Sequence, residues 1–204
     1  MGHPAGVMHR PLPPLAAAAC ACAALVLSAC GGSGGTAGLA PSSVRAAPPA
    51  PRLPRDTPAA LRTNAADANR LAGTGTGALR ARLAKLAGHP VVVNQWASWC
   101  GPCRAEFPYL ARAVARHGGQ VAFLGIDALD SAGAAEQFIA ERPPGFASIF
   151  DPDGDATRSL GGGRGAPTTF FIGADGRLVH TKLGGYPSAA ALEADIGRYA
   201  PARS

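Results

Sequence analysis

The sequence predicts an α/β fold, with a central mixed sheet flanked by helices, in the C-terminal part of the 204-residue chain. From residue 91 onward, short apolar and β-branched runs alternate with stretches of helical periodicity, a pattern typical of layered strands and helices. All twelve aromatic residues lie between Trp96 and Tyr199, and ten of the nineteen prolines lie within the first 58 residues. We therefore expect a folded domain over 59–204, because the earlier part lacks the bulky apolar side chains that offset the entropy of ordering.

The predicted core begins with Val-Val-Val-Asn-Gln-Trp at 91–96, a short run typical of a buried strand. A helix is expected over 104–117, with Phe107, Leu110 and Val114 on one face and two glycines after its end. The later elements are expected as a strand at 121–126, a helix at 134–142, a strand at 146–150, a short helix at 155–160, strands at 168–172 and 177–182 around a turn, and a helix at 188–199 with Ser188 as its N-cap. Residues 61–86 are expected to be mostly helical or irregular.

The first 29 residues have the pattern of an export signal. Arg10 precedes an apolar run at 15–27 that is too short to span a bilayer as a helix. The run ends in Leu-Ser-Ala-Cys, which resembles the bacterial lipoprotein box and implies that Cys30 carries the lipid. The alternative is an ordinary signal peptide with a chance cysteine after it. Residues 30–58 are Gly/Ser-rich and then Pro/Ala-rich, so we expect a disordered tether that holds the domain at the outer face of the cell membrane.

The cysteine inventory favours redox chemistry. If Cys20 and Cys22 leave with the signal and Cys30 is lipidated, only Cys100 and Cys103 remain as thiols. One C-x-x-C pair builds no disulfide framework and supplies too few ligands for zinc. The three histidines of the domain follow no metal-ligand spacing: His89, His117 and His180. We expect no metal and no cofactor other than the disulfide of the pair itself.

The net charge of +6 comes mostly from single arginines scattered among alanine and glycine. A basic run with interleaved aromatic residues, which would track a nucleic-acid backbone, is absent from the sequence. We therefore expect no nucleic-acid partner, while weak attraction to anionic lipid headgroups stays open.

The Cys pair lies where the predicted strand at 91–96 leads into a helix. Free backbone N–H groups and the positive end of the helix dipole favour an anion at this place, so we expect a lowered pKa for the Cys100 thiol. The thiolate is the species that attacks a disulfide, and Cys103, one turn further on, is placed to resolve the mixed disulfide. Pro102 fits the first helical turn, where its missing N–H has no partner to lose.

Residues 99–103 read Trp-Cys-Gly-Pro-Cys, the active-site pentapeptide of thioredoxins. The wider run over 91–108 resembles the exported TlpA/ResA branch of the thioredoxin/redoxin superfamily, and the likeness covers about 78–200. The resemblance implies a thioredoxin fold with the inserted helix and strand of TlpA-like proteins. It also implies a thiol–disulfide oxidoreductase.

Further site residues follow from this resemblance. Residues 165–172 match the segment that carries the family's cis-proline, so Pro167 is expected in cis, facing the Cys pair, with the Ala166 backbone available to an extended substrate. An ordinary trans proline is the alternative. Pro108 matches the position at which the family kinks its active-site helix. Six residues are assigned to substrate binding: Trp99, Gly101, Pro102, Ala166, Pro167 and Thr168.

Glu106 is the third predicted catalytic residue, because in ResA-like proteins a glutamate at this position tunes thiol protonation. A buried carboxylate with a raised pKa could act as a base toward Cys103. The alternative is a solvated carboxylate on the helix surface. Cytoplasmic thioredoxins carry an aspartate in the preceding strand, where this sequence has Asn94, which cannot exchange a proton near neutral pH.

The leading hypothesis is a disulfide reductase on the outer membrane face that serves cytochrome c maturation or keeps other exported thiols reduced. By the same resemblance, a membrane protein of the CcdA/DsbD type would supply its electrons. Three alternatives stay open: an oxidase that forms disulfides in secreted proteins, a thiol peroxidase of the AhpC/TSA-like redoxins, and a membrane-tethered binding module with a structural disulfide. The peroxidase alternative lacks the Pro-x-x-x-Thr-x-x-Cys pattern.

Overall fold

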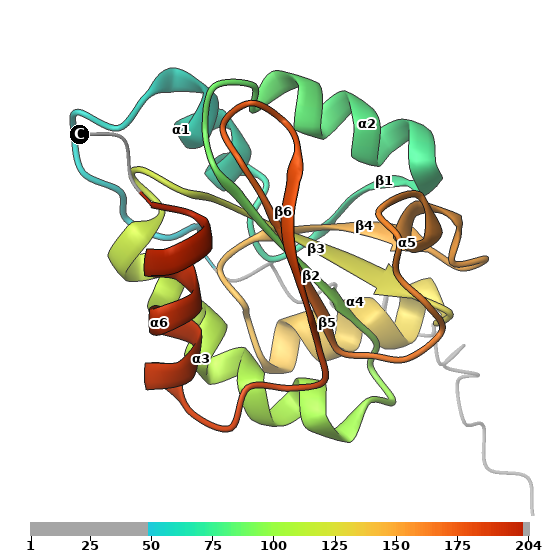
Figure 1. The fold of residues 1–204 in the computed structure, drawn as a ribbon. Coiled ribbons are helices and arrows are strands. Elements are labelled where there is room, and N and C mark those ends of the chain that lie inside the picture. The colour runs from blue at the N-terminus through green and yellow to red at the C-terminus, as the bar shows by residue number, and fades with distance from the viewer. Residues whose placement is uncertain (1–48, 202–204) are drawn as a thin grey trace, which may run out of the picture. The chain divides into compact units, whose positions relative to one another are not determined.

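In the computed structural model, which describes residues 49–201, six strands form one mixed sheet in the order β1-β4-β3-β2-β5-β6 (Figure 1). The pairs β1–β4, β4–β3 and β3–β2 are parallel, and the pairs β2–β5 and β5–β6 are antiparallel. The elements are α1 (Ala59–Ala66), β1 (Leu71–Thr74), α2 (Gly75–Lys85), β2 (Val91–Trp96), α3 (Gly101–His117), β3 (Ala122–Ala128), α4 (Ala132–Glu141), β4 (Ala147–Asp151), α5 (Asp155–Ser159), β5 (Thr168–Ile172), β6 (Leu178–Leu183) and α6 (Ala189–Tyr199). The predicted α/β class and mixed sheet are confirmed.

Helices cover both faces of this sheet (Figure 1). On one face, α3, α4 and α6 bury Phe107, Phe138 and Leu192 against alternate residues of β2, β3 and β5. On the other face, α1, α2 and α5 pack Leu61, Leu79 and Ala156 against the residues in between. Because successive side chains of a strand point to opposite faces, β2 is buried along its whole length, as its apolar sequence predicts.

Most element predictions are confirmed, and one strand is an addition. Ser188 caps α6 by accepting a hydrogen bond of 3.2 Å from the N–H of Ala191, as predicted. The stretch expected to be mostly helical or irregular does contain α1 and α2, but it also contains β1, an edge strand of four residues. Gly73 lies in β1 with φ +119, a conformation that local patterns do not associate with a strand. Pairing with β4 rather than strand propensity thus defines β1.

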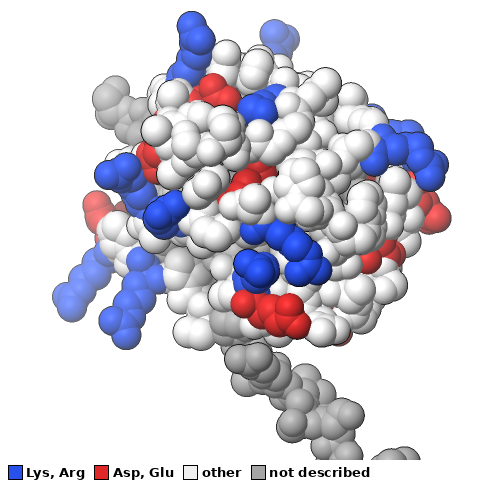
Figure 2. All heavy atoms as spheres, turned by 90° about the horizontal axis from the view of Figure 1, so that it is seen from below, with Lys and Arg blue, Asp and Glu red and all other residues white. Residues whose placement is uncertain are grey.

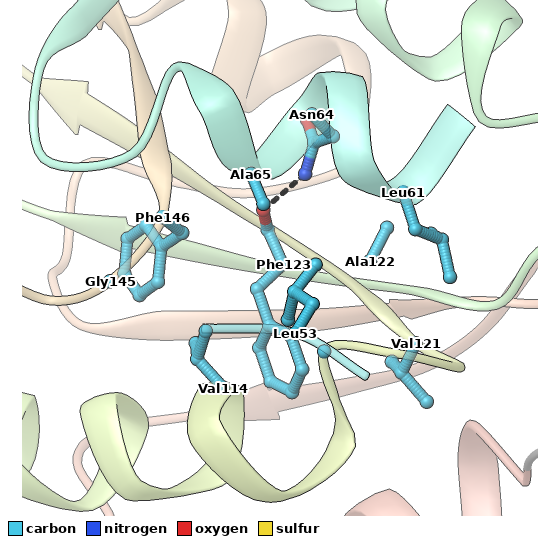
Figure 3. A pocket seen from close by; sticks show the side chains of 11 residues that line it. Leu53, Leu61, Asn64, Ala65, Val114, Val121, Ala122, Phe123, Gly145 and Phe146 are labelled. Carbon is cyan, nitrogen blue, oxygen red and sulfur yellow. Dashed lines mark hydrogen bonds between the residues drawn. The ribbon is translucent and has the colours of Figure 1, made fainter. Parts of the chain in front are cut away.

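The segment before α1 packs against the domain. Leu53 lines a small cavity of about 10 Å³ together with Val114 of α3, Leu61 of α1 and Phe123 of β3 (Figure 3). Thr57 is 2% exposed. The Nδ2 of Asn64 donates a hydrogen bond of 3.1 Å to the carbonyl of Phe123 at the same place. Packing therefore starts several residues before the predicted domain boundary at residue 59.

The predicted export signal, the lipidation site Cys30 and the first part of the tether lie outside the described residues. Within residues 49–201, no helix combines the length and apolarity that crossing a membrane requires.

Candidate active site

Cys100 and Cys103 form a disulfide at the junction of β2 and α3, with 5.3 Å between their Cα atoms. Cys100 is the N-cap of α3, and its Sγ accepts a hydrogen bond of 3.2 Å from the N–H of Cys103. Cys100 is 3% exposed and Cys103 is fully buried, whereas the neighbouring Trp99 is 58% exposed. The pair thus lies at the positive end of a 17-residue helix, as predicted, with the outer sulfur nearer to solvent.

The loop before the pair is held by the segment that follows β3. Asp130 accepts hydrogen bonds from both the backbone N–H and the hydroxyl of Ser98. The indole N–H of Trp99 donates to the carbonyl of Leu129 at 3.1 Å. Arg104 returns from α3 and donates two hydrogen bonds to the carbonyl of Ser98, at 3.1 and 2.8 Å. Five hydrogen bonds therefore fix the approach to Cys100, and no sequence motif predicts any of these contacts.

Glu106 lies in the second turn of α3 and is fully buried. Its Oε1 accepts from the Nδ2 of Asn94 at 2.9 Å, and its Oε2 accepts from the N–H of Tyr186 at 2.9 Å. Burial raises the pKa of the Glu106 carboxyl, and the two hydrogen bonds and the charge of Lys182 oppose that rise only in part. The alternative of a solvated carboxylate is therefore wrong, because α3 and its neighbours enclose the side chain. The role of Glu106 as a base stays a prediction.

The Ala166–Pro167 peptide bond is cis, as the resemblance implied. The carbonyl of Pro167 accepts a hydrogen bond of 2.9 Å from the N–H of Gly184. In the described part of the chain, no backbone-to-backbone hydrogen bond engages Ala166, which precedes β5. Its peptide groups are thus available to an extended segment, in line with the predicted substrate site.

The structure brings three of the predicted site residues, Pro102, Pro167 and Glu106, to one point. A Cβ atom on Gly185 would lie 3.5 Å from Pro102, 3.6 Å from Pro167 and 3.6 Å from Oε2 of Glu106, so three separate chain segments meet there. Gly101 and Pro102 are exposed. Thr168 differs from them: it is 2% exposed, and its hydroxyl donates to the carbonyl of Gly165 at 3.1 Å. Its side chain supports the loop before Pro167 and does not reach the surface.

Two more buried titratable residues adjoin the site and were not predicted. Burial, with further contributions from Asp130 and Asp151, raises the pKa of Asp127 to about 8. Burial and Asp195, whose carboxylate accepts from the Tyr186 hydroxyl at 2.9 Å, raise the pKa of Tyr186. The one sequence signal for either of them was that Asp127, a polar residue, directly follows the apolar strand predicted at 121–126.

The described surface shows dispersed charge. In Figure 2, Lys and Arg side chains are spread over the face in view, with acidic side chains between them and uncharged surface around them. In the stretch from residue 49 to residue 201, no three His, Cys, Asp or Glu side chains are grouped to hold a metal ion. The reactive groups that the structure brings to the site include the two sulfurs and the buried Glu106 carboxyl.

Comparison with known proteins identifies relatives of this arrangement. The family model described as Redoxin matches residues 62–196. The chain is 44% identical over 102 residues to the thiol:disulfide interchange protein DsbE of Pseudomonas fluorescens biotype C, covering 50% of this chain and 55% of that protein. It is 30% identical over 110 residues to the thiol-disulfide oxidoreductase ResA of Bacillus subtilis (strain 168), covering 53% of this chain and 61% of ResA.

A solved structure of similar fold is that of a secreted Mycobacterium tuberculosis disulfide oxidoreductase homologous to E. coli DsbE. It has a TM-score of 0.50 and 28% sequence identity, and the match covers 56% of this chain and 85% of that one. The predicted thioredoxin fold is confirmed by this likeness. The chain spans about half the length of the curated DsbE proteins it matches.

Proposed function

Because the chain belongs to the redoxin family, we propose that it is a thiol–disulfide oxidoreductase that works through Cys100 and Cys103 as a disulfide reductase. The observation that carries the proposal is the disulfide of this pair at the N-terminus of α3, beside a cis-proline loop whose Ala166 backbone is available for pairing. The names of the relatives, thiol:disulfide interchange protein and thiol-disulfide oxidoreductase, support the same class of reaction.

The reaction begins from the reduced pair. The Cys100 thiolate attacks one sulfur of a substrate disulfide, forms a mixed disulfide and expels the other substrate sulfur as a thiolate. Two features stabilise the Cys100 anion: the dipole of α3 and the N–H of Cys103, which is 3.2 Å from Sγ in the oxidised form. The exposed Trp99 and the Ala166 backbone hold the substrate segment on either side of the reacting sulfur.

The second step regenerates the disulfide seen in the structure. Cys103 loses its proton and attacks Sγ of Cys100, which releases the second substrate sulfur as a thiolate. Two electrons have then passed from the pair to the substrate, whose two sulfurs leave as thiols after protonation. Glu106 lies three residues after Cys103 on the same helix, and its raised pKa suits a group that accepts the Cys103 proton near neutral pH.

The reduced pair must be regenerated by an electron donor. We assign the protein to the outer face of the cell membrane, with lipidation at Cys30, a CcdA/DsbD-type donor, and exported thiols such as those of cytochrome c maturation as substrates. Support comes from the signal-like sequence over 1–29 and from the likeness to DsbE and ResA. Globomycin, which blocks lipoprotein signal cleavage, and a Cys30→Ser variant should both leave an uncleaved precursor if Cys30 is the lipid carrier.

The reduction potential of the pair tests the direction of electron flow. The purified protein is equilibrated in thiol redox buffers, and the fraction of Cys100–Cys103 disulfide is read by thiol alkylation. A value near that of thioredoxin, about −270 mV, is expected for a reductase. A value near −120 mV, typical of strong oxidants, would contradict the reductase and favour a disulfide-forming enzyme.

A further inference from the structure

The turn that follows β6 forms one wall of the candidate active site. Gly185 of this turn lies at the point where Pro102, Glu106 and Pro167 come together, at 3.5–3.6 Å from the position of a Cβ atom. The next residue, Tyr186, donates its N–H to Glu106 at 2.9 Å. The conformation of the turn therefore determines the position of the Tyr186 N–H, one of the two hydrogen-bond donors to the Glu106 carboxyl.

Lys182, the penultimate residue of β6, binds this turn through its ammonium group. Nζ donates to the carbonyls of Leu183 at 2.9 Å, Gly184 at 2.8 Å and Gly185 at 3.2 Å, so all three ammonium protons are used. Three successive carbonyl groups thus point toward one cation. Without that charge, their aligned dipoles would repel one another, and the turn would lose the interaction that holds its carbonyls together.

The Lys182 ammonium also acts on the buried carboxyl. Nζ lies 5.0 Å from the centre of the Tyr186 ring, and Tyr186 is the residue whose N–H donates to Glu106. The positive charge of Lys182 favours the ionised form of Glu106 and so lowers the pKa of that carboxyl, against the effect of burial.

We propose that Lys182 is a positioning residue for disulfide exchange: it fastens the turn at 183–185 so that the Tyr186 N–H meets Glu106, and its charge favours the Glu106 carboxylate. The inference rests on the proposed function, in which that carboxylate accepts the proton of Cys103. It deepens the function by adding a group from β6 to a site built on β2, α3 and the loop that precedes β5.

The other groups that face Glu106 do not supply a positive charge. Asn94 from β2 donates a neutral hydrogen bond, and Cys103 lies one turn earlier on the same helix. Tyr186 carries a phenol whose hydroxyl is bound to Asp195 of α6, so α6 contributes negative charge. Among the described residues acting on this carboxyl, Lys182 is therefore the cation.

The chain provides a matched control, because it contains two lysines, Lys182 and Lys85. Lys85 is exposed at the end of α2, on the sheet face opposite α3. The test compares the wild-type chain with Lys182→Met, Lys182→Arg and Lys85→Met. The pKa of Glu106 is measured on the oxidised protein from the pH dependence of its ¹³C carboxyl NMR signal, which needs no substrate. The rate of disulfide reduction is measured over the same pH range.

The expected result is a higher Glu106 pKa in Lys182→Met, and reduction about threefold slower at pH 7, because less of the carboxyl is ionised. Lys182→Arg, which keeps the charge, should retain the wild-type Glu106 pKa, and Lys85→Met should match the wild type in both measurements. An unchanged Glu106 pKa in Lys182→Met, or an equal shift in Lys85→Met, would overturn the inference.

Folding and function are separated by these variants and one further substitution. If Lys182→Met does not fold, Lys182→Gln takes its place, because it also removes the charge but keeps a hydrogen-bond donor: a raised Glu106 pKa supports the inference, and a wild-type Glu106 pKa overturns it. If the wild-type chain reduces no disulfide while Lys182→Met still raises the Glu106 pKa, the proposed function fails and the positioning of the carboxyl stands.

Discussion

Asn94 donates a hydrogen bond of 2.9 Å from Nδ2 to Oε1 of Glu106, which joins the middle of β2 to the second turn of α3 behind the Cys pair. The same Nδ2 lies 3.2 Å from the hydroxyl of Thr169 in β5. The strand position that carries an acid in cytoplasmic thioredoxins, by the resemblance above, is therefore occupied here by an amide that serves the helix carboxyl. In this chain the titratable group lies on the helix, and the strand supplies its hydrogen-bond donor.

Glu106→Gln should slow disulfide reduction at pH 7 by about tenfold or more, because an amide cannot accept the Cys103 proton. The rate is measured from pH 5 to pH 9 on a disulfide substrate, and the variant should lose the rise in rate that follows Glu106 ionisation. Glu136→Gln, on the exposed side of α4, is the matched control and should leave the profile unchanged. A Glu106→Gln profile that overlays the wild type would remove Glu106 from the mechanism.

Cys103→Ala should accumulate mixed disulfides with substrate proteins through Cys100, because the resolving thiol is gone. Cys100→Ala should accumulate none, since Cys103 is fully buried in the oxidised structure. The adducts are counted by non-reducing electrophoresis and located by peptide mass spectrometry. Absence of adducts in both variants would favour a binding module whose disulfide is structural.

Asp127→Asn should change how stability depends on pH. With a pKa of about 8 in the folded protein, Asp127 keeps its proton over a range in which the unfolded chain has released it. Its contribution to stability is therefore fully present below about pH 4 and is lost as the pH rises toward 8. Relative to the wild type, Asp127→Asn should gain stability across that window, by at most about 1.4 kcal/mol per pH unit.

Urea unfolding between pH 4 and pH 9 measures this gain, with Asp153→Asn as an exposed control. If the free energy of unfolding of the wild type and of Asp127→Asn changed with pH in parallel, the Asp127 carboxyl would titrate normally in the folded protein.

Gly125→Ala should destabilise the domain by about 1–3 kcal/mol through overpacking. Gly125 lies in β3, and an added Cβ would meet Ser148 Oγ at 2.1 Å and Trp96 Nε1 at 2.7 Å, the two atoms that hydrogen-bond to each other at 3.0 Å. Gly197→Ala, in α6 with open space around the added methyl, should instead stabilise by up to about 1 kcal/mol. Thermal unfolding followed by circular dichroism measures both, and a neutral Gly125→Ala would contradict this close packing.

The parts of the site predicted from sequence are those that a short run of residues encodes. The Cys pair, its helix N-terminus and the cis-proline are each carried by a contiguous motif. Asp130 is different, because it binds Ser98 from 32 residues away and is an ordinary loop acid in its own neighbourhood. Lys182 likewise has the local sequence of a polar residue in an edge strand. Its effect on Glu106 depends on the turn that follows β6.

The same reasoning explains β1. Leu71–Thr74 is short and contains a glycine, so its local sequence does not predict a strand. The segment is a strand because it pairs with β4. For Glu106, the sequence shows only that it lies three residues after Cys103. Its burial depends on how α3 packs against the neighbouring elements, which a sequence pattern does not show.

The segment at 49–58 packs near the C-terminal end of α3, away from the Cys pair. Pro49 accepts a hydrogen bond from Asn69, and a Cβ on Gly118, just past the end of α3, would lie 3.0 Å from Leu53. The Cys pair is at the other end of α3, about 25 Å away for a helix of 17 residues. The packed segment at 49–58 and the Cys pair thus lie toward opposite ends of α3, so a protein that docks at the sulfurs does not compete with the packing of this segment.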